Sequence, residues 1–586
     1  MIFNSYLENF FEELIFRIRR NICFAVISAF CAFLPDTLAY AQSVDRQTER
    51  IQEQLRERER ERAESFREEQ SRPPTGVKAI VTEPGAASLG GGCATVHDVH
   101  IEGMTRFRRG DFTEVLAPLV GSCVEVAAID AALRAITNRY VAAGYVTSRA
   151  FVGPQDLRSG TLNITVFEGR VGDIDGVGDK PYGPGEIGGA FPSATGDLLN
   201  LRSLEQGVDQ LGRLGKAEPS IDIAPGESPG TSKVLVQRKD AGAWIRPNLG
   251  LNNQGSTSTG RWQAMVGLDA DSPLGLADSW SIYYQNEVDG DRLRGNEAYG
   301  GFASVPYGWW TLSLDAGVSR YHSVLEGNGL AFETRGQSWS AGANLDRVIF
   351  RNAKTKLALT GSLSVQDTKN FIQGIALRTG SYRIASATIS ARWQHRAKAT
   401  LWSTSLGLEQ GLGLFGAYAV DAGPGGAKGK FSLIAADVAA QTGFTLGKMR
   451  LTNRAILRSQ WGFTNLFPAQ RFSLGGPSTV RGFRDDGISG RSGASLREEL
   501  SVSLIDLATK SRMRTNVSTF VSYDIGGILP SAFDAFERGL LQSISAGMRA
   551  QGRHIQAEVA VAAPLSAPPW VRHRGAEVMA SVRVTL

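Results

Sequence analysis

A single arginine set among glycines and a proline offers the most specific side-chain chemistry in this sequence. Arg481 lies in the segment Phe472–Asp486, which also contains three glycines and one proline. Such residues set an unusual backbone path, and an arginine held on that path commonly pairs with a fixed carboxylate. About 40 residues later, the segment Phe520–Gly526 offers that carboxylate as Asp524. We therefore predict a charge-assisted Arg481–Asp524 pair that anchors the loop motif Val480, Arg481, Gly482 and Phe483. Taken alone, the motif is equally compatible with an ordinary surface turn.

Other residues with potential chemistry do not form a catalytic or metal-binding set. His97 and His100 are spaced so that they point to opposite faces of a strand, and the chain has 6 histidines in all. The segment Gly411–Gly416 matches G-x-G-x-x-G, but no helix follows it, so the context of a dinucleotide site is missing. No Ser/His/Asp or Cys/His set with catalytic logic is evident. We therefore expect no enzyme activity, no cofactor and no bound metal.

The composition favours many strands over a nucleic-acid-binding protein. The 586 residues include 63 Lys and Arg against 58 Asp and Glu, a formal net charge of +5 without basic clusters. The 67 glycines, 10 tryptophans and 13 tyrosines are typical of strands with tight turns and aromatic girdles. Nucleic acid is therefore not an expected partner.

Residues 241–586 alternate with a period of two, which predicts β-strands. In Met449–Trp461, apolar side chains share one strand face and Arg450, Arg454 and Arg458 share the other. An arginine facing lipid costs about 2–4 kcal/mol at the bilayer midplane, so these three must face a wet lumen. The same argument makes the strand face that carries Arg514 and Asp524 lumenal. At about 20–22 residues per strand and turn, the region predicts some 16 antiparallel strands. A soluble β-sandwich or propeller would also alternate.

The amino terminus has the pattern of an export signal. Three arginines precede an apolar run, Ile22–Leu34, which ends before the small-x-small site Ala39–Ala41. A buried N-terminal helix is the alternative. Removal of residues 1–41 leaves two cysteines, Cys93 and Cys123, in an exported chain. An even pair in an oxidising compartment predicts one disulfide.

Residues 42–70 are rich in Arg, Glu and Gln, with i,i+3 charge pairs that support a helix but no continuous apolar stripe. This helix is either a solvated tail or a mobile polar helix that occupies a polar cavity. A Pro/Gly/Ala-rich linker follows at 71–92.

Two compact α+β units are predicted next, each of which could alone be a generic module. In residues 93–170 the expected order is β-α-α-β-β, and in 171–238 a helix precedes two strands. The first unit has a strand at Val99 and Ile101, a short helix at Phe112–Leu119, a helix with Ile129, Leu133, Ile136, Tyr140 and Val141 on one face, and strands at Val146–Val152 and Leu162–Phe167. The second has a helix with Leu204, Val208 and Leu211 on one face and strands at Ser220–Ala224 and Lys233–Gln237.

These motifs resemble a known family. Val480–Phe483 and Phe520–Gly526 resemble the V-R-G-F loop and F-x-x-x-D-x-G strand signatures of the Omp85 superfamily of outer-membrane barrels. The two α+β units resemble the POTRA domains of two-partner secretion transporters, on the segments Gly144–Ala150, Gln155–Leu157, Glu168–Arg170 and Leu199–Leu211. The whole mature chain resembles a TpsB transporter, of the kind called ShlB/FhaC/HecB-like haemolysin secretion/activation proteins.

The resemblance implies a domain order and a function. The order is a signal peptide at 1–41, a plug helix at 42–70, a linker at 71–92, POTRA domains at 93–170 and 171–240, and a barrel at 241–586. Such a protein lies in the bacterial outer membrane, with its POTRA domains in the periplasm. It exports a large TpsA-type exoprotein, such as a haemolysin, haemagglutinin or adhesin. Outer-membrane lipid and the barrel-assembly machinery are implied partners. The alternatives are a barrel-assembly factor of the same superfamily and a passive porin.

Overall fold

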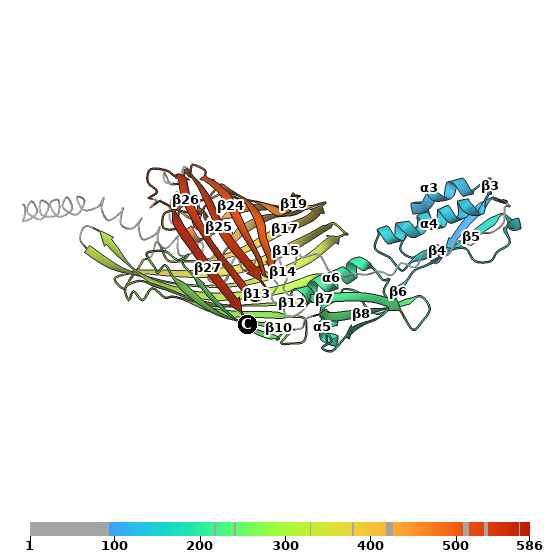
Figure 1. Ribbon diagram of the computed structural model, residues 1–586, viewed down its shortest axis with the longest axis horizontal. Coiled ribbons are helices and arrows are strands. Elements are labelled where there is room, and N and C mark those ends of the chain that lie inside the picture. Colours follow the sequence, from blue (N-terminus) through green and yellow to red (C-terminus); the bar gives the residue numbers. More distant parts are fainter. Residues whose placement is uncertain are drawn as a thin grey trace, which may run out of the picture.

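The structure is a computed structural model that describes residues 93–215, 218–239, 242–327, 330–377, 380–417, 426–507, 515–531, 537–572 and 575–586. The predicted signal peptide, plug helix and linker, together with Arg514, lie outside the described residues. Two small α+β units follow one another beyond one end of a closed barrel (Figure 1). No helix among the residues described combines the length and apolarity that crossing a bilayer requires.

The first unit packs one long helix against a small mixed sheet. Helix α4 (Val126–Ala142) buries Ile136 and Tyr140 against β5, and Gly144 follows it with a φ of 98°. A positive φ suits glycine, which explains why the helix ends there. The sheet has the order β2-β5-β4, and a separate pair joins β1 to β3. The remaining elements are β1 (Ala94–Val96), β2 (Asp98–Glu102), η1 (Arg109–Phe112), α3 (Thr113–Leu116), η2 (Ala117–Leu119), β3 (Ser122–Val124), β4 (Arg149–Phe151), η3 (Leu157–Ser159) and β5 (Thr161–Phe167).

Three details of this unit differ from the expectation. The strand predicted at Val146–Val152 is only the three-residue β4, because the chain first makes turns that bring Ser148 beneath Gly169. Val141, predicted on the apolar face of α4, is 38% exposed. The neighbouring Tyr140 packs in the core instead, and the next residue of the helix turns away from it. The β1–β3 pair was not predicted, since strands of three residues carry too little alternation to recognise.

The second unit has a three-stranded sheet covered by two helices. Asn200 caps α6 (Leu201–Gly212) by accepting a hydrogen bond from the Arg202 amide at 2.8 Å. The predicted apolar face of α6, Leu204, Val208 and Leu211, is buried against the sheet. The sheet order is β6-β8-β7. The elements β6 (Arg170–Val177) and α5 (Pro184–Ala190) were not predicted, whereas β7 (Glu218–Pro225) and β8 (Thr231–Lys239) contain the predicted strands.

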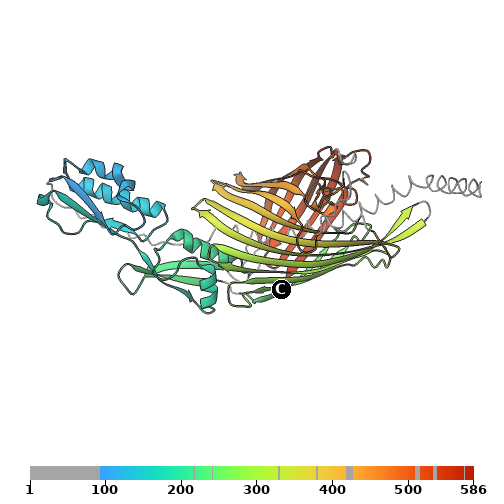
Figure 2. The ribbon, with the colours of Figure 1, turned by 180° about the vertical axis from the view of Figure 1, so that it is seen from behind.

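Sixteen long antiparallel strands in the described part of the chain close into a barrel, as the sequence predicts, and the first, β9, pairs with the last, β27. The two-residue β16 (Ile375–Ala376) adds a short pairing to β15. The hairpin of β13 and β14 extends past the other strands at the end away from the α+β units (Figure 2). The strands are β9 (Ile245–Asn252), β10 (Gln263–Asp271), β11 (Ser279–Glu287), β12 (Gly295–Tyr307), β13 (Trp310–Gly327), β14 (Leu330–Arg351), β15 (Thr355–Ile372), β17 (Tyr382–Ala397), β18 (Thr400–Leu412), β19 (Ser432–Leu446), β20 (Met449–Gly462), β23 (Gly493–Leu507), β24 (Thr515–Ile528), β25 (Gly539–Gly552), β26 (Ile555–Ser566) and β27 (Glu577–Thr585).

The strand faces separate a lipid side from a lumen side. On β24, Val521 and Tyr523 are 53% and 40% exposed, whereas the alternating Phe520 and Asp524 are 1% exposed. Exposed apolar side chains on a barrel wall suit lipid, and the polar alternates point inward. The turns between β12 and β13, β14 and β15, β17 and β18, and β19 and β20 lie at the end that carries the second unit. This follows because the β12–β13 turn bonds to that unit and every second turn of an up-and-down barrel shares an end.

Candidate functional site

The predicted loop motif lies inside the barrel on a backbone that only glycine adopts easily. Between β20 and β23, the strands β21 (Phe472–Leu474) and β22 (Ile488–Gly490) pair antiparallel and follow the short helix η4 (Pro468–Gln470). Gly475, Gly476 and Gly482 have φ values of 113°, 108° and 88°, where a side chain would be strained. The motif residues Val480 and Phe483 are buried in a cluster with Phe472, Leu474, Ile488, Ile528, Leu541 and Val571.

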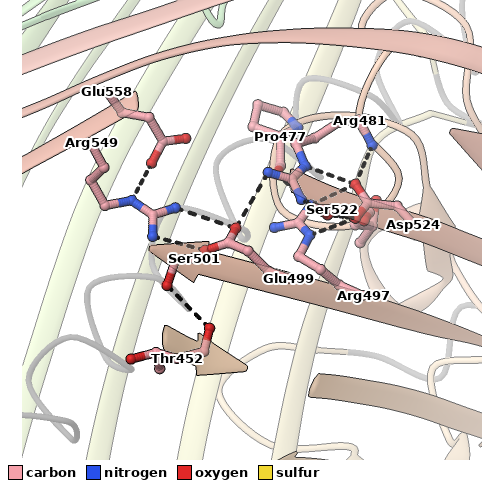
Figure 3. Close-up of polar contacts among 11 residues, drawn as sticks. Thr452, Pro477, Arg481, Arg497, Glu499, Ser501, Ser522, Asp524, Arg549 and Glu558 are labelled. Carbon is pink, nitrogen blue, oxygen red and sulfur yellow. Dashed lines mark hydrogen bonds and ion pairs between the residues drawn. The ribbon is translucent and has the colours of Figure 1, made fainter. Parts of the chain in front are cut away.

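Arg481 and Asp524 form a two-pronged pair (Figure 3). The Nε of Arg481 donates to Oδ2 of Asp524 at 2.8 Å, and Nη2 donates to Oδ1 at 3.0 Å. The Arg481 amide also donates to Oδ2, at 3.2 Å. Ser522 lies between them, accepting from Arg481 and donating to Asp524 at 2.7 Å. Both partners are almost fully buried, at 3% and 1% exposed. Backbone and side chain of the loop are therefore held by one carboxylate.

A second arginine, Arg497 of β23, shares the same carboxylate. Its Nε donates to Asp524 at 3.2 Å, and its Nη2 donates to the carbonyls of Pro477 and Thr479 at 2.7 and 3.0 Å. Arg497 therefore joins the loop backbone directly to the wall. Arg497 is not among the site residues predicted from the sequence. The available signal is its alternation with the apolar Leu496 and Leu500 along β23. Its partner follows from the pairing of Arg497 with Asp524 across β23 and β24.

The contacts continue along the wall to β25 and β26. Arg549 donates to Glu499 at 2.9 Å and to Glu558 at 2.7 Å, and Glu499 also lies 3.7 Å from Arg481. The guanidinium carbons of Arg481 and Arg549 lie 5.6 and 4.8 Å from the ring centre of Phe520. We call these three arginines and three carboxylates the loop network: Arg481, Arg497, Arg549, Glu499, Asp524 and Glu558. Its charges balance, so removal of one member leaves a partly buried charge without compensation.

The far side of the loop contacts a different part of the wall. Arg484 is 8% exposed, and its Nη2 donates to the Val578 carbonyl of β27 at 3.1 Å. Asp485 accepts a hydrogen bond from the Thr257 amide, in the loop after β9, at 2.9 Å. A Cβ on Gly482 would lie 3.2 Å from Pro564 of β26. The loop thus reaches from β23 and β24 across to β27 and β9, where the barrel closes.

The predicted lumen-facing arginines of β20 occupy different depths. Arg458 lies beside the loop, and its Nη1 donates to the Ser478 carbonyl at 3.5 Å. Arg454 is half-buried opposite Gln441 and Glu499 in the strand register. Arg450 is exposed at the end of the barrel that carries the second unit. All three share one face because no register shift interrupts β20.

Cys93 and Cys123 form a disulfide, with their Cα atoms 5.3 Å apart. It joins the start of the first unit to β3, just before α4, where Thr95 pairs with Cys123. Within the described ranges, His, Cys, Asp and Glu side chains form no group of three or more suited to a metal ion.

Glu168, between β5 and β6 at the end of the first unit, accepts four hydrogen bonds from within that unit. The carboxylate accepts from the amides of Thr105 and Arg106, each at 2.9 Å, from the Thr105 hydroxyl, and from the Tyr140 hydroxyl at 2.8 Å. Partial burial alone would raise the pKa of Glu168. The hydrogen bonds from Thr105, Arg106 and Tyr140 outweigh it and hold the pKa below its usual value.

The second unit is joined to the barrel by carboxylates of α6. Asp209 lies 2.5 Å from Arg351 of β14 and 3.4 Å from Lys356 of β15, and Glu205 lies 3.4 Å from Arg351. We call these four residues the α6 junction. Arg351 and Asp209 are both 7% exposed, so the pair is shielded from water. Sequence reasoning did not find this site.

A β-bulge is the reason that Arg351 reaches α6. The pairing of β14 with β15 shifts between Val348 and Phe350, which leaves Ile349 as an extra residue. A one-residue shift changes the face on which later side chains point. Leu345 and Phe350 are both exposed on the lipid side, so Arg351 turns inward together with Lys356, its partner in the register.

Further contacts beside the α6 junction hold the second unit against the barrel. Gln210 donates to the Gly308 carbonyl at 3.0 Å, and the Gly308 amide donates to the Gly189 carbonyl at 2.8 Å. Arg213 contacts Ser304 of β12 and is 3% exposed. Burial lowers the pKa of Arg213 to about 10, against the opposing effect of nearby carboxylates. The second unit therefore lies against the end of β12 to β15.

Comparison with known proteins agrees with this architecture. Residues 230–550 match the family "Haemolysin secretion/activation protein ShlB/FhaC/HecB", residues 94–169 match a ShlB-type POTRA domain and residues 170–225 match a further POTRA domain. The outer membrane transporter CdiB of Escherichia coli is 31% identical over 490 residues, which cover 83% of this chain and 81% of that protein. The hemolysin transporter protein ShlB of Serratia marcescens is 30% identical over 469 residues, covering 77% and 79%.

Solved structures give the same result. The structure of CdiB from Escherichia coli matches with a TM-score of 0.81 and 29% identity, over 92% of this chain and 98% of that one. CdiB from Acinetobacter baumannii, at 20% identity and a TM-score of 0.74, shares the fold. Two POTRA domains before a closed barrel of sixteen strands are thus an Omp85-type architecture, with the barrel in the outer membrane and the POTRA domains in the periplasm. The chain belongs to the ShlB/FhaC/HecB family of haemolysin secretion/activation proteins and is an outer-membrane transporter of the two-partner secretion type.

Proposed function

We propose that this transporter exports a large TpsA-type exoprotein, such as a haemolysin, haemagglutinin or adhesin, through its barrel. The observation that carries the proposal is the loop network, because it fixes a glycine-rich loop inside the barrel with a buried, bidentate Arg481–Asp524 pair. A loop that only filled space would not need two arginines on one carboxylate. We assign Val480, Arg481, Gly482 and Phe483 to a loop that lines the export path, with Asp524 as its fixed partner.

The periplasm has no ATP, so folding of the exoprotein outside the cell is the driving force we infer. The POTRA pair would receive the unfolded exoprotein in the periplasm, where an extended client can add to an open strand edge. A lumen lined by Arg450, Arg454, Arg458 and serines would keep such a chain hydrated. We assign no catalytic role to any residue, and we expect the barrel-assembly machinery to insert the protein into outer-membrane lipid.

The direct test seeks a large, repeat-rich exoprotein in a neighbouring gene and measures whether this transporter exports it. Co-expression of the two should place the exoprotein in the medium, and omission of the transporter should leave it in the periplasm. A barrel-assembly factor would instead lower the amounts of unrelated outer-membrane proteins when it is removed. Wild-type export without the transporter would contradict the proposal.

We also propose that the helix at 42–70 plugs the lumen at rest. Its deletion should raise single-channel conductance in planar bilayers while export stays largely intact. A matched deletion within the linker 71–92 is the control. Equal conductance of the two variants and the intact protein would show that the helix is a solvated tail.

A further inference from the structure

Described turns at the periplasmic end of the barrel differ in whether their cations are paired with carboxylates. On one side, the cations Arg351 and Lys356 at the β14–β15 turn are neutralised by Asp209 and Glu205 of α6. In the described part of the chain, the second unit does not extend over the next two turns at this end, β17–β18 and β19–β20 (Figures 1 and 2). They are adjacent, because β18 pairs with β19 from Thr400 onwards.

These two turns present exposed cations. Arg396 and Lys398 belong to the first turn, and Lys448 and Arg450 belong to the second. We call this group the mouth cations. Within the described part of the chain, these four side chains make no ion pair. The acidic residues described on β17 to β20 are Glu409 and Asp437, and both lie deeper in the barrel, with Asp437 opposite Arg458.

Strand alternation shows on which face of the barrel wall the side chains of Arg396 and Arg450 lie. On β17, the alternates of Arg396 include Ile389 and Trp393, which are 70% and 37% exposed on the lipid side. On β20, the alternates of Arg450 include Leu457 and Trp461, which are 41% and 54% exposed. Both arginines therefore point toward the lumen. The outward neighbours at the same level are apolar, among them Trp402, Phe444, Leu446 and Met449.

We propose that the mouth cations receive acidic stretches of an extended polypeptide as it enters the barrel. This inference rests on the proposed export function. The α6 junction contains the same kind of contact, because the carboxylates of α6 already pair with the cations of the neighbouring β14–β15 turn. Cations at the rim of a low-dielectric opening also raise the local concentration of anionic segments. Lumen-facing arginines favour a polypeptide over lipid headgroups, which would require cations on the outward face.

The test uses purified full-length protein in nanodiscs and a fluorescent decaglutamate peptide. The variant replaces all four mouth cations with glutamine: Arg396→Gln, Lys398→Gln, Lys448→Gln and Arg450→Gln. The control removes four exposed cations from the periplasmic units: Arg108→Gln, Arg134→Gln, Arg158→Gln and Lys180→Gln. We expect the mouth variant to bind the peptide about tenfold or more weakly at low salt, while the control binds as the unaltered protein does. Heat-dependent gel mobility checks that each barrel is folded.

Equal peptide affinity in the mouth variant and the unaltered protein would overturn the proposal. So would a mouth variant that binds the peptide normally but loses co-purifying phosphatidylglycerol, because the cations would then hold lipid. Export is measured separately with the co-expressed exoprotein. Absence of export by the unaltered protein would refute the proposed function, whereas normal export by the mouth variant would refute only the receiving surface.

Discussion

The loop network and the α6 junction use the same side-chain chemistry to hold different kinds of structure. In each, one carboxylate serves two cations: Asp524 binds Arg481 and Arg497, and Asp209 binds Arg351 and Lys356. In the loop network the arginine lies on a glycine-rich segment that has its own buried apolar cluster. In the α6 junction the two partners belong to separately folded units.

The two sets of ion pairs prevent different movements: displacement of a loop inside the barrel, and separation of the second unit from the barrel. The loop is confined inside a closed wall, so loss of its pair changes the shape of the lumen without separating two domains. The second unit can swing away from the barrel if its contacts weaken, because inter-domain contacts in one chain resemble transient interfaces. We therefore expect the loop network to govern export itself and the α6 junction to govern the placement of the periplasmic unit.

Replacement of Arg481 should have the largest effect. Arg481→Ala should abolish or strongly reduce export. It removes a cation from the buried carboxylates of Asp524 and Glu499, at a local cost of about 3–5 kcal/mol. Arg481→Lys should also fail, since an ammonium cannot make the planar two-pronged contact. The measurement is exoprotein in the medium against exoprotein retained in cells.

The matched control is Arg450→Lys, which keeps the charge at an exposed lumen position that makes no two-pronged contact. It should export normally, and all three variants should retain the heat-dependent gel mobility of a folded barrel. Wild-type export by both Arg481 variants would show that the pair has no role in transport.

Charge reversal at the α6 junction should have the next largest effect. Asp209→Arg and Arg351→Asp should each release α6 from the barrel, because each places like charges together in a shielded site. The double variant restores the Asp–Arg pair in reverse, so the α6 amides should regain part of their protection against hydrogen exchange. Recovery should be incomplete because Glu205 and Lys356 keep their original charges. Hydrogen exchange of the α6 amides measures the release. Single variants with unchanged exchange would mean that the backbone contacts at Gly308 suffice.

Loss of the disulfide should act on stability alone. The chain-entropy model gives about 3–4 kcal/mol for a loop closed by Cys93 and Cys123. A Cys93→Ser, Cys123→Ser variant should therefore expose the first unit to protease at lower temperature, with the barrel unaffected. Labelling of the unreduced, exported protein should find no free thiol on the peptides that carry these two residues. Two reactive thiols would contradict the prediction.

The smallest effect should come from Glu168. The lowered pKa of Glu168 means that its carboxylate stabilises the first unit at pH values above the ordinary pKa of 4.5. That contribution is lost as the pH falls through the lower, folded-state pKa. Glu168→Gln should thus lower the thermal stability of the first unit at pH 7, with a difference that shrinks below about pH 4. Protease resistance against pH measures it, with Glu114→Gln, an exposed glutamate, as the control. If the protease-resistance curves of Glu168→Gln and the unaltered protein stay parallel at all pH values, titration of Glu168 does not contribute to stability.

Much of the architecture follows from local sequence patterns. The alternation of arginines with apolar residues in Met449–Trp461 predicts both the strand and its wet face, because successive side chains of a strand point to opposite sides. Spacing and chain length predict the sixteen strands. The apolar face of α6 follows from Leu204, Val208 and Leu211 in the same way. The three-residue strands β1 and β3 fall below what alternation can reveal.

The candidate site also combines features that follow from local sequence with features that depend on the tertiary structure. Sequence alone determined that Arg481 lies on a constrained loop and that Asp524 lies on a lumenal strand face, since glycine, proline and strand period act between chain neighbours. Only the tertiary structure decided that Arg497 shares Asp524 and that Arg351 meets Asp209 in a distant helix. Those contacts depend on strand register and on the bulge at Ile349, which moves Arg351 to the other face. A shift of this kind changes the phase of the alternation, but only Phe350 and Arg351 follow it before β14 ends, which is too short a stretch to reveal the bulge from the sequence.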